Sequence, residues 1–302
     1  MEPYIVNVNS ESSISDNNDI KRLKYYQYFL IYFISFLLFI PLVIYTIMEP
    51  DKNMNKLLYK KLSMYSIVIF LSWLNGKIFL EYYKMKVNYT RKINHIIVWS
   101  IPFTIDKLID VPETNLSILW NIILIIIGHV LWMIPSREFD KTGFLNTCYS
   151  TIDRPEDRPN TLLWLVLQTI GAGITILPFG FLWQYWDVSD YLFVPLIILT
   201  FGDGFAEIIG VKYGKHKYKV SALCTDTEYT RSYEGSFCVY LSGIIIICLL
   251  YSKFKFEEFL INIILVPFIG MFSEAFSPHT LDNPMIILST STVLSLTHLI
   301  FI

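Results

Sequence analysis

The sequence predicts an all-α, polytopic integral membrane protein with about nine transmembrane helices. The first observation is composition: of 302 residues, 54% are hydrophobic, 16% are aromatic and only 17% are charged. The second is a mean hydropathy of +0.47, which is too high for a soluble domain of this length. The third is that basic residues gather in alternate connections between long apolar stretches. The core is therefore expected to face lipid.

The N-terminal segment, residues 1–24, is expected to be a disordered cytoplasmic tail. It contains the polar, acidic run "NSESSISDNNDI", and no basic segment precedes a short apolar core, as a signal peptide would require. Residues 25–302 then form a single multi-pass membrane domain. Its apolar stretches approach the roughly 20 residues that span a bilayer. They cover residues 25–47, 62–83, 93–109, 116–134, 161–183, 190–211, 234–252, 258–277 and 283–301.

The distribution of Lys and Arg predicts the orientation. Sixteen of these residues lie in the tail and in the connections after the second, fourth and sixth stretches, against six on the opposite side. Because basic loops stay in the cytoplasm, the N-terminus and these connections are expected to be cytoplasmic. We expect an endoplasmic reticulum-type membrane, or the plasma membrane in a bacterium.

Two features limit the classes of function. The net charge of −2 gives no basis for nucleic acid as a partner. The four cysteines form no CxxC pair and no His/Cys ligand spacing, so we expect free thiols rather than disulfides or zinc ligands. The long connections at about 135–160 and 212–233 are where function is expected.

The stretch "FGDGFAEIIGVKYGKHKY", residues 201–218, combines small residues with acids. Small residues recur every four positions, a spacing that lets membrane helices approach closely: Gly202, Ala206, Gly210 and Gly214. Packing alone would explain them. It does not explain Asp203 and Glu207, which also lie four apart and share one helical face.

Asp203 and Glu207 need a compensating partner. An acid near bilayer depth costs a few kcal/mol, and two stacked carboxylates repel unless a cation, a proton or a basic group lies between them. Together with phosphate oxygens they would suit Mg²⁺. Lys212 and Lys215 follow within reach of a polyanionic phosphate, although such lysines also occur as ordinary membrane anchors.

Three further polar clusters are predicted on the same membrane face. They are "RKINH" with Arg91, Lys92 and His95; "TRSYEGS" with Arg231, Ser232, Glu234 and Gly235; and "SEAFSPHTLDN" with Glu274, Asp282 and Asn283. Each alone could be structural, as snorkelling anchors, an acid at a helix N-terminus, or a turn with an N-cap. Their convergence on one face favours a functional site.

Taken in order, these motifs resemble the CTP-dependent lipid kinases: dolichol kinase, phytol and farnesol kinase, and the yeast-type diacylglycerol kinase. The resemblance covers about residues 91–283, roughly two thirds of the chain. Its most specific part is the GDG stretch with its four-residue glycine step, followed by S-x-E-G-S. Arg231 stands where many members have Lys, and Glu207 where many have Asp. These departures indicate a distinct subgroup.

The resemblance implies a multi-pass enzyme that uses CTP and a divalent cation to phosphorylate a membrane lipid alcohol from the cytoplasmic side. Asp203 and Glu207 would hold the metal. The implied nucleotide-binding residues are Arg91, Lys92, Gly202, Gly204, Gly210, Lys212, Lys215, Arg231, Ser232, Gly235 and Asn283. Asp203, Glu234 and Asp282 are each candidates for the base that accepts the alcohol proton. The lipid itself, a polyprenol or dolichol, phytol or farnesol, or diacylglycerol, is not specified.

Two alternative functions would also use some of these features. The related phosphatidate cytidylyltransferases transfer CMP, but they carry an H-G-G motif followed by D-R. The comparable segment here, "SPHTLDNP", has no glycine pair, which favours phosphoryl transfer. An ion-coupled transporter could also use acids within a span. However, the acids and bases gather at one face, and no inverted repeat is visible.

Overall fold

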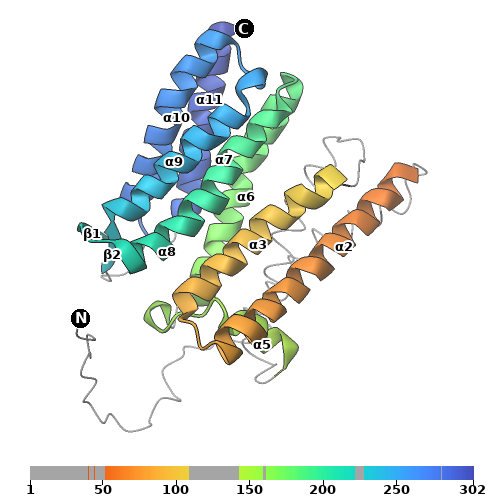
Figure 1. Ribbon diagram of the computed structural model, residues 1–302. Helices are drawn as coiled ribbons and strands as arrows, with labels where there is room; N and C mark the ends of the chain where they lie inside the picture. The colour runs from red at the N-terminus through yellow and green to blue at the C-terminus, as the bar shows by residue number, and fades with distance from the viewer. Residues whose placement is uncertain are drawn as a thin grey trace.

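The computed structural model describes residues 40, 44, 52–108, 143–158, 161–221, 228–279 and 281–302. The chain is mostly helical, and its long helices run roughly side by side (Figure 1). Seven of the nine predicted stretches fall on described helices. The stretch 116–134, and all of 25–47 except residues 40 and 44, lie outside the described residues, as does the predicted disordered tail.

The elements follow one another along the chain with short connections. In order they are α2 (Lys52–Asn75), η1 (Gly76–Tyr82), α3 (Val87–Leu108), α5 (Phe144–Ser150), η2 (Pro155–Asp157), α6 (Thr161–Tyr185), η3 (Ser189–Leu192), α7 (Phe193–Ile197), η4 (Ile198–Asp203), α8 (Gly204–Tyr213), β1 (Lys217–Ser221), β2 (Glu228–Ser232), α9 (Tyr233–Leu249), η5 (Tyr251–Lys253), α10 (Phe256–Phe276) and α11 (Asp282–Phe301). The segments η1 and η4 are π-helical.

Several helices are suited to cross a membrane. Four helical stretches of the described residues are long and apolar enough: Tyr59–Tyr82, Ser189–Tyr213, Phe256–Phe276 and Asp282–Phe301. Helix α9 is apolar but shorter. A mostly helical protein with several membrane-spanning candidates is thus confirmed, whereas the count of nine is not.

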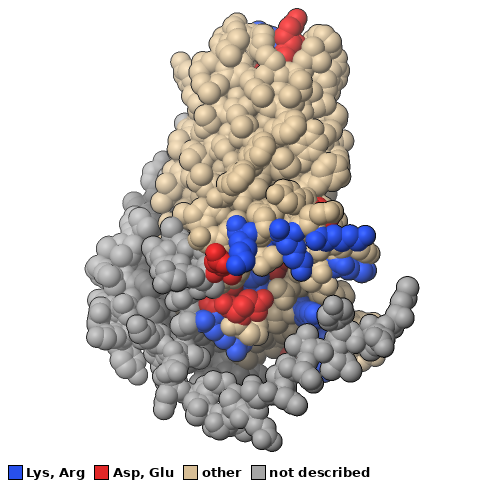
Figure 2. Space-filling view, turned by 90° about the vertical axis from the view of Figure 1, so that its left-hand side faces the viewer, with Lys and Arg blue, Asp and Glu red and all other residues tan. Residues whose placement is uncertain are grey.

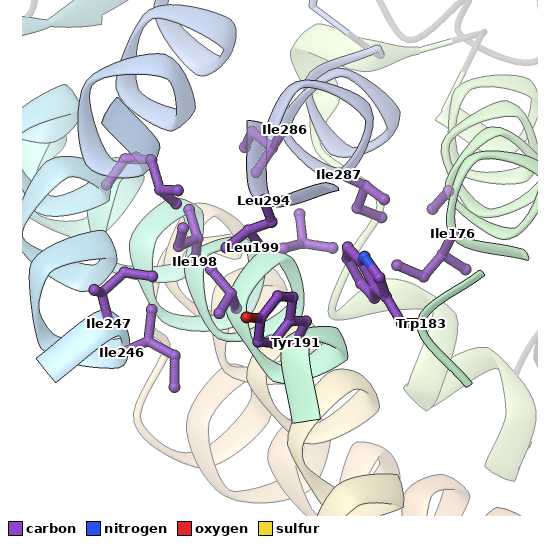
Figure 3. Close-up of a cluster of buried hydrophobic side chains, with 14 of the residues drawn as sticks. Ile176, Trp183, Tyr191, Ile198, Leu199, Ile246, Ile247, Ile286, Ile287 and Leu294 are labelled. Atoms are coloured by element: carbon purple, nitrogen blue, oxygen red, sulfur yellow. The ribbon is translucent and has the colours of Figure 1, made fainter. Parts of the chain in front are cut away.

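The hydrophobic core lies among α6, α7, η4, α9 and α11 (Figure 3). Its largest fully buried side chains include Trp183 and Tyr191, whose rings meet edge to face at 6.1 Å. Ile198 and Leu199 of η4 are also fully buried. Helices α2 and α3 lie on the flank of this bundle, with α3 against α8 and η4 (Figure 1). The core therefore fixes η4, and with it Asp203.

The small residues at the four-residue step pack against α9. A Cβ added to Gly202 would lie 3.0 Å from the Cα of Val239, and one added to Gly210 would lie 2.9 Å from the hydroxyl of Ser232. From the other side, a Cβ on Gly235 would meet the carbonyl of Ala206 at 2.6 Å. This close helix approach needs residues without large side chains.

We expect Gly202→Leu to destabilise the protein, because the backbone of α9 leaves no room for the new side chain. Overpacking of this kind costs about 1–3 kcal/mol or more. Thermal unfolding of the detergent-solubilised protein measures the effect. Phe205→Leu, on the neighbouring helix at a side chain that is 43% exposed, is the control and should shift the midpoint little. Equal midpoints for the two variants would contradict the packing assignment.

A two-stranded antiparallel hairpin occupies the connection between α8 and α9, which the sequence did not predict. Tyr218 of β1 pairs with Arg231 of β2. Exposed and half-buried residues alternate along both strands, so one side of the hairpin faces the protein. Arg231 is one of the half-buried residues and lies on the side of the hairpin that faces the protein. Ser232 then begins α9 by accepting a hydrogen bond from the backbone N–H of Gly235 at 3.1 Å.

Charged side chains gather at the hairpin end of the molecule. Figure 2 shows a band of Lys, Arg, Asp and Glu there, below a broad surface without these charged residues, with a smaller charged group at the opposite end. The predicted clusters around Arg91, Asp203, Arg231 and Asp282 therefore lie at one end of the bundle, joined by the ion pairs described below.

We expect this end to be cytoplasmic. Lys215 follows the span that ends at Tyr213, whereas Lys255 directly precedes α10 at the other end of the bundle. In a background without native cysteines, Lys215→Cys should react with a membrane-impermeant maleimide from the cytoplasmic side and Lys255→Cys from the opposite side. Reaction of both from the same side would overturn the predicted topology.

Candidate functional site

A cavity of about 400 Å³ lies at the charged end, where α3, α8, the hairpin, α9, α10 and the start of α11 converge. Five acids and five Lys or Arg side chains line it: Glu156, Asp203, Glu207, Glu274 and Asp282, with Arg91, Lys92, Arg154, Lys217 and Arg231. The charges of its lining are therefore balanced.

Asp203 and Glu207 share a basic partner from α3. The Lys92 ammonium donates to Oδ2 of Asp203 at 2.7 Å and lies 3.6 Å from Oε2 of Glu207. Lys92 and Asp203 are almost fully buried, at 4% and 6% exposure. The repulsion expected between the two acids is thus relieved by a cation placed between them. The prediction that they share one face is confirmed.

Glu207 is held by three further side chains. Arg91 donates to Oε2, while Arg154 donates to Oε1 at 2.9 Å and Asn88 at 3.1 Å. Two guanidinium groups on one carboxylate form a strong, oriented arrangement. Glu207 therefore anchors α8 to α3 and to the loop that precedes α6.

Arg154 connects this group to the rim of the cavity. Its Nε and Nη2 donate to the two oxygens of Asp157 at 2.8 and 2.9 Å, and Tyr229 donates to Asp157 at 3.2 Å. Burial alone would raise the pKa of Asp157, but hydrogen bonding to His279 and the charge of Arg154 outweigh it and lower the pKa to about 2. The His279 ring also stacks on Tyr229 at 3.9 Å.

Arg231 bridges two acids on the far side of the cavity. Its Nη1 lies 3.1 Å from Oε1 of Glu274, and its Nη2 donates to Oδ2 of Asp282 at 3.4 Å. Glu274 also accepts a hydrogen bond from Ser236 at 3.0 Å. Oδ1 of Asp282 accepts one from Gln168 of α6 at 2.9 Å. The Asp282 carboxylate is thus oriented from two sides, and only one of these partners is charged.

A second, smaller cavity of about 70 Å³ adjoins the first. The two share four lining residues: Arg91, Lys92, Asp203 and Asp282. The rest of the smaller lining mixes apolar side chains such as Trp99 and Leu165 with polar ones such as Gln168 and Asn283. Asp203 and Asp282 therefore lie where a strongly charged cavity meets a partly apolar one.

Most of the predicted site residues come together here. Those lining the larger cavity are Arg91, Lys92, Asp203, Glu207, Gly210, Arg231, Ser232, Gly235 and Asp282, and Asn283 lines the smaller one. The others line neither cavity: Gly202, Gly204, Lys212, Lys215 and Glu234.

The predicted residues outside the cavities have other neighbours. A Cβ on Gly204 would lie 3.2 Å from the side chain of Ile96, so this glycine faces α3. The ammonium of Lys212 lies 5.1 Å from the ring centre of Tyr213. Glu234 pairs with the exposed His216 at 2.9 Å. The roles of Gly204 and Lys212 in nucleotide binding, and of Glu234 as a candidate base, stay predictions.

Sequence reasoning did not assign Arg154, Asn88 or Gln168 to the site. Arg154 counted only as one of many basic loop residues, and its partners are distant in sequence. Gln168 left a usable signal, because it is a lone amide within the apolar run "LLWLVLQTI". A polar side chain inside a membrane helix marks a functional position more often than a surface residue does. The predicted free thiols are confirmed for Cys238 and Cys248.

A magnesium ion would fit this site only in company with phosphate. Within the described ranges, no group of three or more His, Cys, Asp or Glu side chains is placed to hold a metal ion. The larger cavity nevertheless presents carboxylate oxygens, notably those of Asp203 and Glu207. Mg²⁺ is commonly held by one or two carboxylates plus substrate phosphates. Binding in that mode would require these carboxylates to exchange contacts with Lys92, Arg91 or Arg154 for the ion.

The comparisons with known proteins add no family to this geometry. Family models, curated proteins and solved structures all gave no significant match to the chain.

Proposed function

We propose that this protein is a CTP-dependent lipid kinase, which transfers the terminal phosphoryl group of the nucleotide to the hydroxyl of a membrane lipid alcohol. One observation carries the proposal: a highly charged cavity and a partly apolar one meet at two buried aspartates, Asp203 and Asp282. Phosphoryl transfer to a lipid needs both environments side by side, because the polyanionic nucleotide and the hydrophobic lipid alcohol must come into contact at one point. The motif resemblance supports the same reaction.

The larger cavity is the proposed nucleotide site. It is lined from two different sides by basic residues, Arg91 and Lys92 on one side and Arg231 on the other. This arrangement suits a triphosphate, whose phosphate groups must be contacted along its length. Each of these bases is paired with an acid. Because the lining is balanced in charge, a triphosphate is expected to bind together with a cation rather than alone.

Asp203 and Glu207 would hold the magnesium ion. When bound, the metal would neutralise charge on the phosphate oxygens. Arg154 and Asn88 keep the Glu207 carboxylate in place through their hydrogen bonds. Lys92 would contact both Asp203 and the phosphate, and would thereby connect the proposed metal site with the proposed nucleotide site.

Asp282 is the preferred candidate for the base. It lines both cavities, and its nearest charged partner, Arg231, lies at 3.4 Å. Asp203 is more strongly neutralised, with the Lys92 ammonium at 2.7 Å. Glu234 lines neither cavity. In the proposed step the alcohol oxygen bonds to the terminal phosphorus, the bond to the β-phosphate oxygen breaks, CDP leaves, and Asp282 accepts the alcohol proton.

A labelling experiment tests the function. Purified protein is incubated with Mg²⁺, with a panel of lipid alcohols and, separately, with phosphatidate as the acceptor of a cytidylyltransferase, and with CTP or ATP labelled at either the γ or the α phosphate. The proposal expects γ label in lipid, with CTP preferred. Label from the α position would instead establish a cytidylyltransferase. Absence of lipid labelling across the panel would overturn the kinase proposal and favour the transporter.

A further inference from the structure

The helix that carries Asp203 contains a π-helical turn that ends at Asp203 itself. Helix α7 ends at Ile197, η4 covers Ile198–Asp203, and α8 begins at Gly204. A π-helical turn accommodates an extra residue, and such turns are frequent at functional sites. An α-helix rotates by about 100° per residue. Without the extra residue, Asp203 and Glu207 would point in a different direction relative to α7.

His95 of α3 holds a carbonyl of this turn. Its Nε2 lies 3.0 Å from the carbonyl oxygen of Leu199. A carbonyl only accepts hydrogen bonds, so Nε2 carries the hydrogen and donates it. Leu199 is fully buried, and its carbonyl therefore has no access to water as a replacement partner. The bond fastens α3 to η4 four residues before Asp203.

The same nitrogen of His95 lies 3.6 Å from Oδ2 of Asp203. Lys92 and His95 are three residues apart and so lie on one face of α3. Lys92 contacts the carboxylate of Asp203, and His95 contacts the backbone of the turn that presents it. His95 also lines the smaller cavity. Helix α3 thus contacts both the side chain of Asp203 and the backbone of the π-helical turn η4.

We infer that His95 is a positioning residue for Asp203. Through the Leu199 carbonyl it fixes the π-helical turn, so that the Asp203 carboxylate faces both cavities. The inference rests on the proposed function, in which Asp203 holds the metal and its direction decides the rate. A role in packing alone would affect stability without a specific effect on metal use.

A pair of substitutions separates the two roles. His95→Gln keeps an N–H donor at a similar reach, whereas His95→Leu keeps the bulk and removes the donor. We expect His95→Leu to lower kcat about 100-fold, the scale of a misplaced catalytic group. It should also raise the Mg²⁺ concentration for half-maximal activity, with little change in KM for CTP. His95→Gln should restore both values to within several-fold of the wild type.

Hydrogen–deuterium exchange gives a readout that does not depend on activity. Peptides covering Ile198–Asp203 should exchange faster in His95→Leu than in the wild type, and at the wild-type rate in His95→Gln. Ser100→Ala is the matched control, because it removes a hydrogen bond on the same helix, to the carbonyl of Ile96, and lines neither cavity. It should leave activity and exchange unchanged.

The outcomes are distinguishable. If the Gln and Leu variants have equal kcat and equal exchange, the positioning role is overturned. If His95→Leu does not fold, His95→Asn replaces it, since its amide is one methylene shorter than that of Gln and stops short of the carbonyl. A wild-type protein without lipid phosphorylation would overturn the proposed function instead, and the exchange comparison would still decide whether His95 holds the turn.

Discussion

Asp203→Asn is expected to lower the rate of lipid phosphorylation by at least about 100-fold, the scale of losing one preorganised electrostatic contact to the transition state. The amide keeps the shape of the side chain but removes the charge that would hold Mg²⁺. Rates measured over a range of Mg²⁺ concentrations should show a higher metal requirement. Near-normal activity at low Mg²⁺ would move the metal role away from Asp203.

The fold should survive this substitution. Lys92 would lose its closest partner, and a buried charge left alone costs roughly 3–5 kcal/mol. Because Glu207 lies 3.6 Å from the same ammonium, the loss of stability should be smaller than that. Glu207→Asp is the matched control: it shortens the side chain but keeps the charge, so its effect on the rate should be milder.

Asp282→Asn is expected to lower kcat by about 10²–10⁴-fold, the usual contribution of a general base. The nucleotide KM should change little, since the proposed phosphate contacts are made by other side chains. Steady-state kinetics at saturating lipid alcohol measures the two constants separately. Loss confined to KM, with kcat preserved, would show that Asp282 binds nucleotide rather than accepting a proton.

Glu234→Gln is the control for Asp282. Both acids lie at the start of a helix and both belong to predicted motifs, but Glu234 pairs with His216 outside both cavities. Its removal should leave kcat within a few-fold of the wild type. A large loss of kcat in this variant would reopen the choice of base, because the sequence alone did not distinguish these acids.

The helices were predictable because the hydrophobicity of each one is visible in its own sequence. An apolar stretch near the length of a bilayer is visible without knowledge of its neighbours, and seven stretches fall on described helices. The hairpin around Tyr218 and Arg231 was not predictable in this way. Its strands are five residues each, in a charged connection, and one side of the hairpin packs on the protein, which the local sequence does not reveal.

The site was predictable in part for a similar reason. Asp203 and Glu207 were identified because two acids four residues apart within an apolar stretch are costly in a membrane and therefore indicate a functional site. Their partners Lys92 and Arg154 lie more than fifty residues away along the chain, and only the packing of α3 and of the loop before α6 brings them together. The sequence did not predict the π-helical turn, and only the structure shows the contact of His95 with the Leu199 carbonyl.

The most direct test of the two-cavity site uses γ-labelled CTP and a lipid alcohol with three proteins purified in parallel. These are the wild type, the Asp203→Asn/Asp282→Asn double variant and Glu234→Gln. We expect label in lipid with the wild type and with Glu234→Gln, and none above background with the double variant, which also excludes a contaminating kinase. Equal labelling by the wild type and the double variant would contradict an active site built where the two cavities meet.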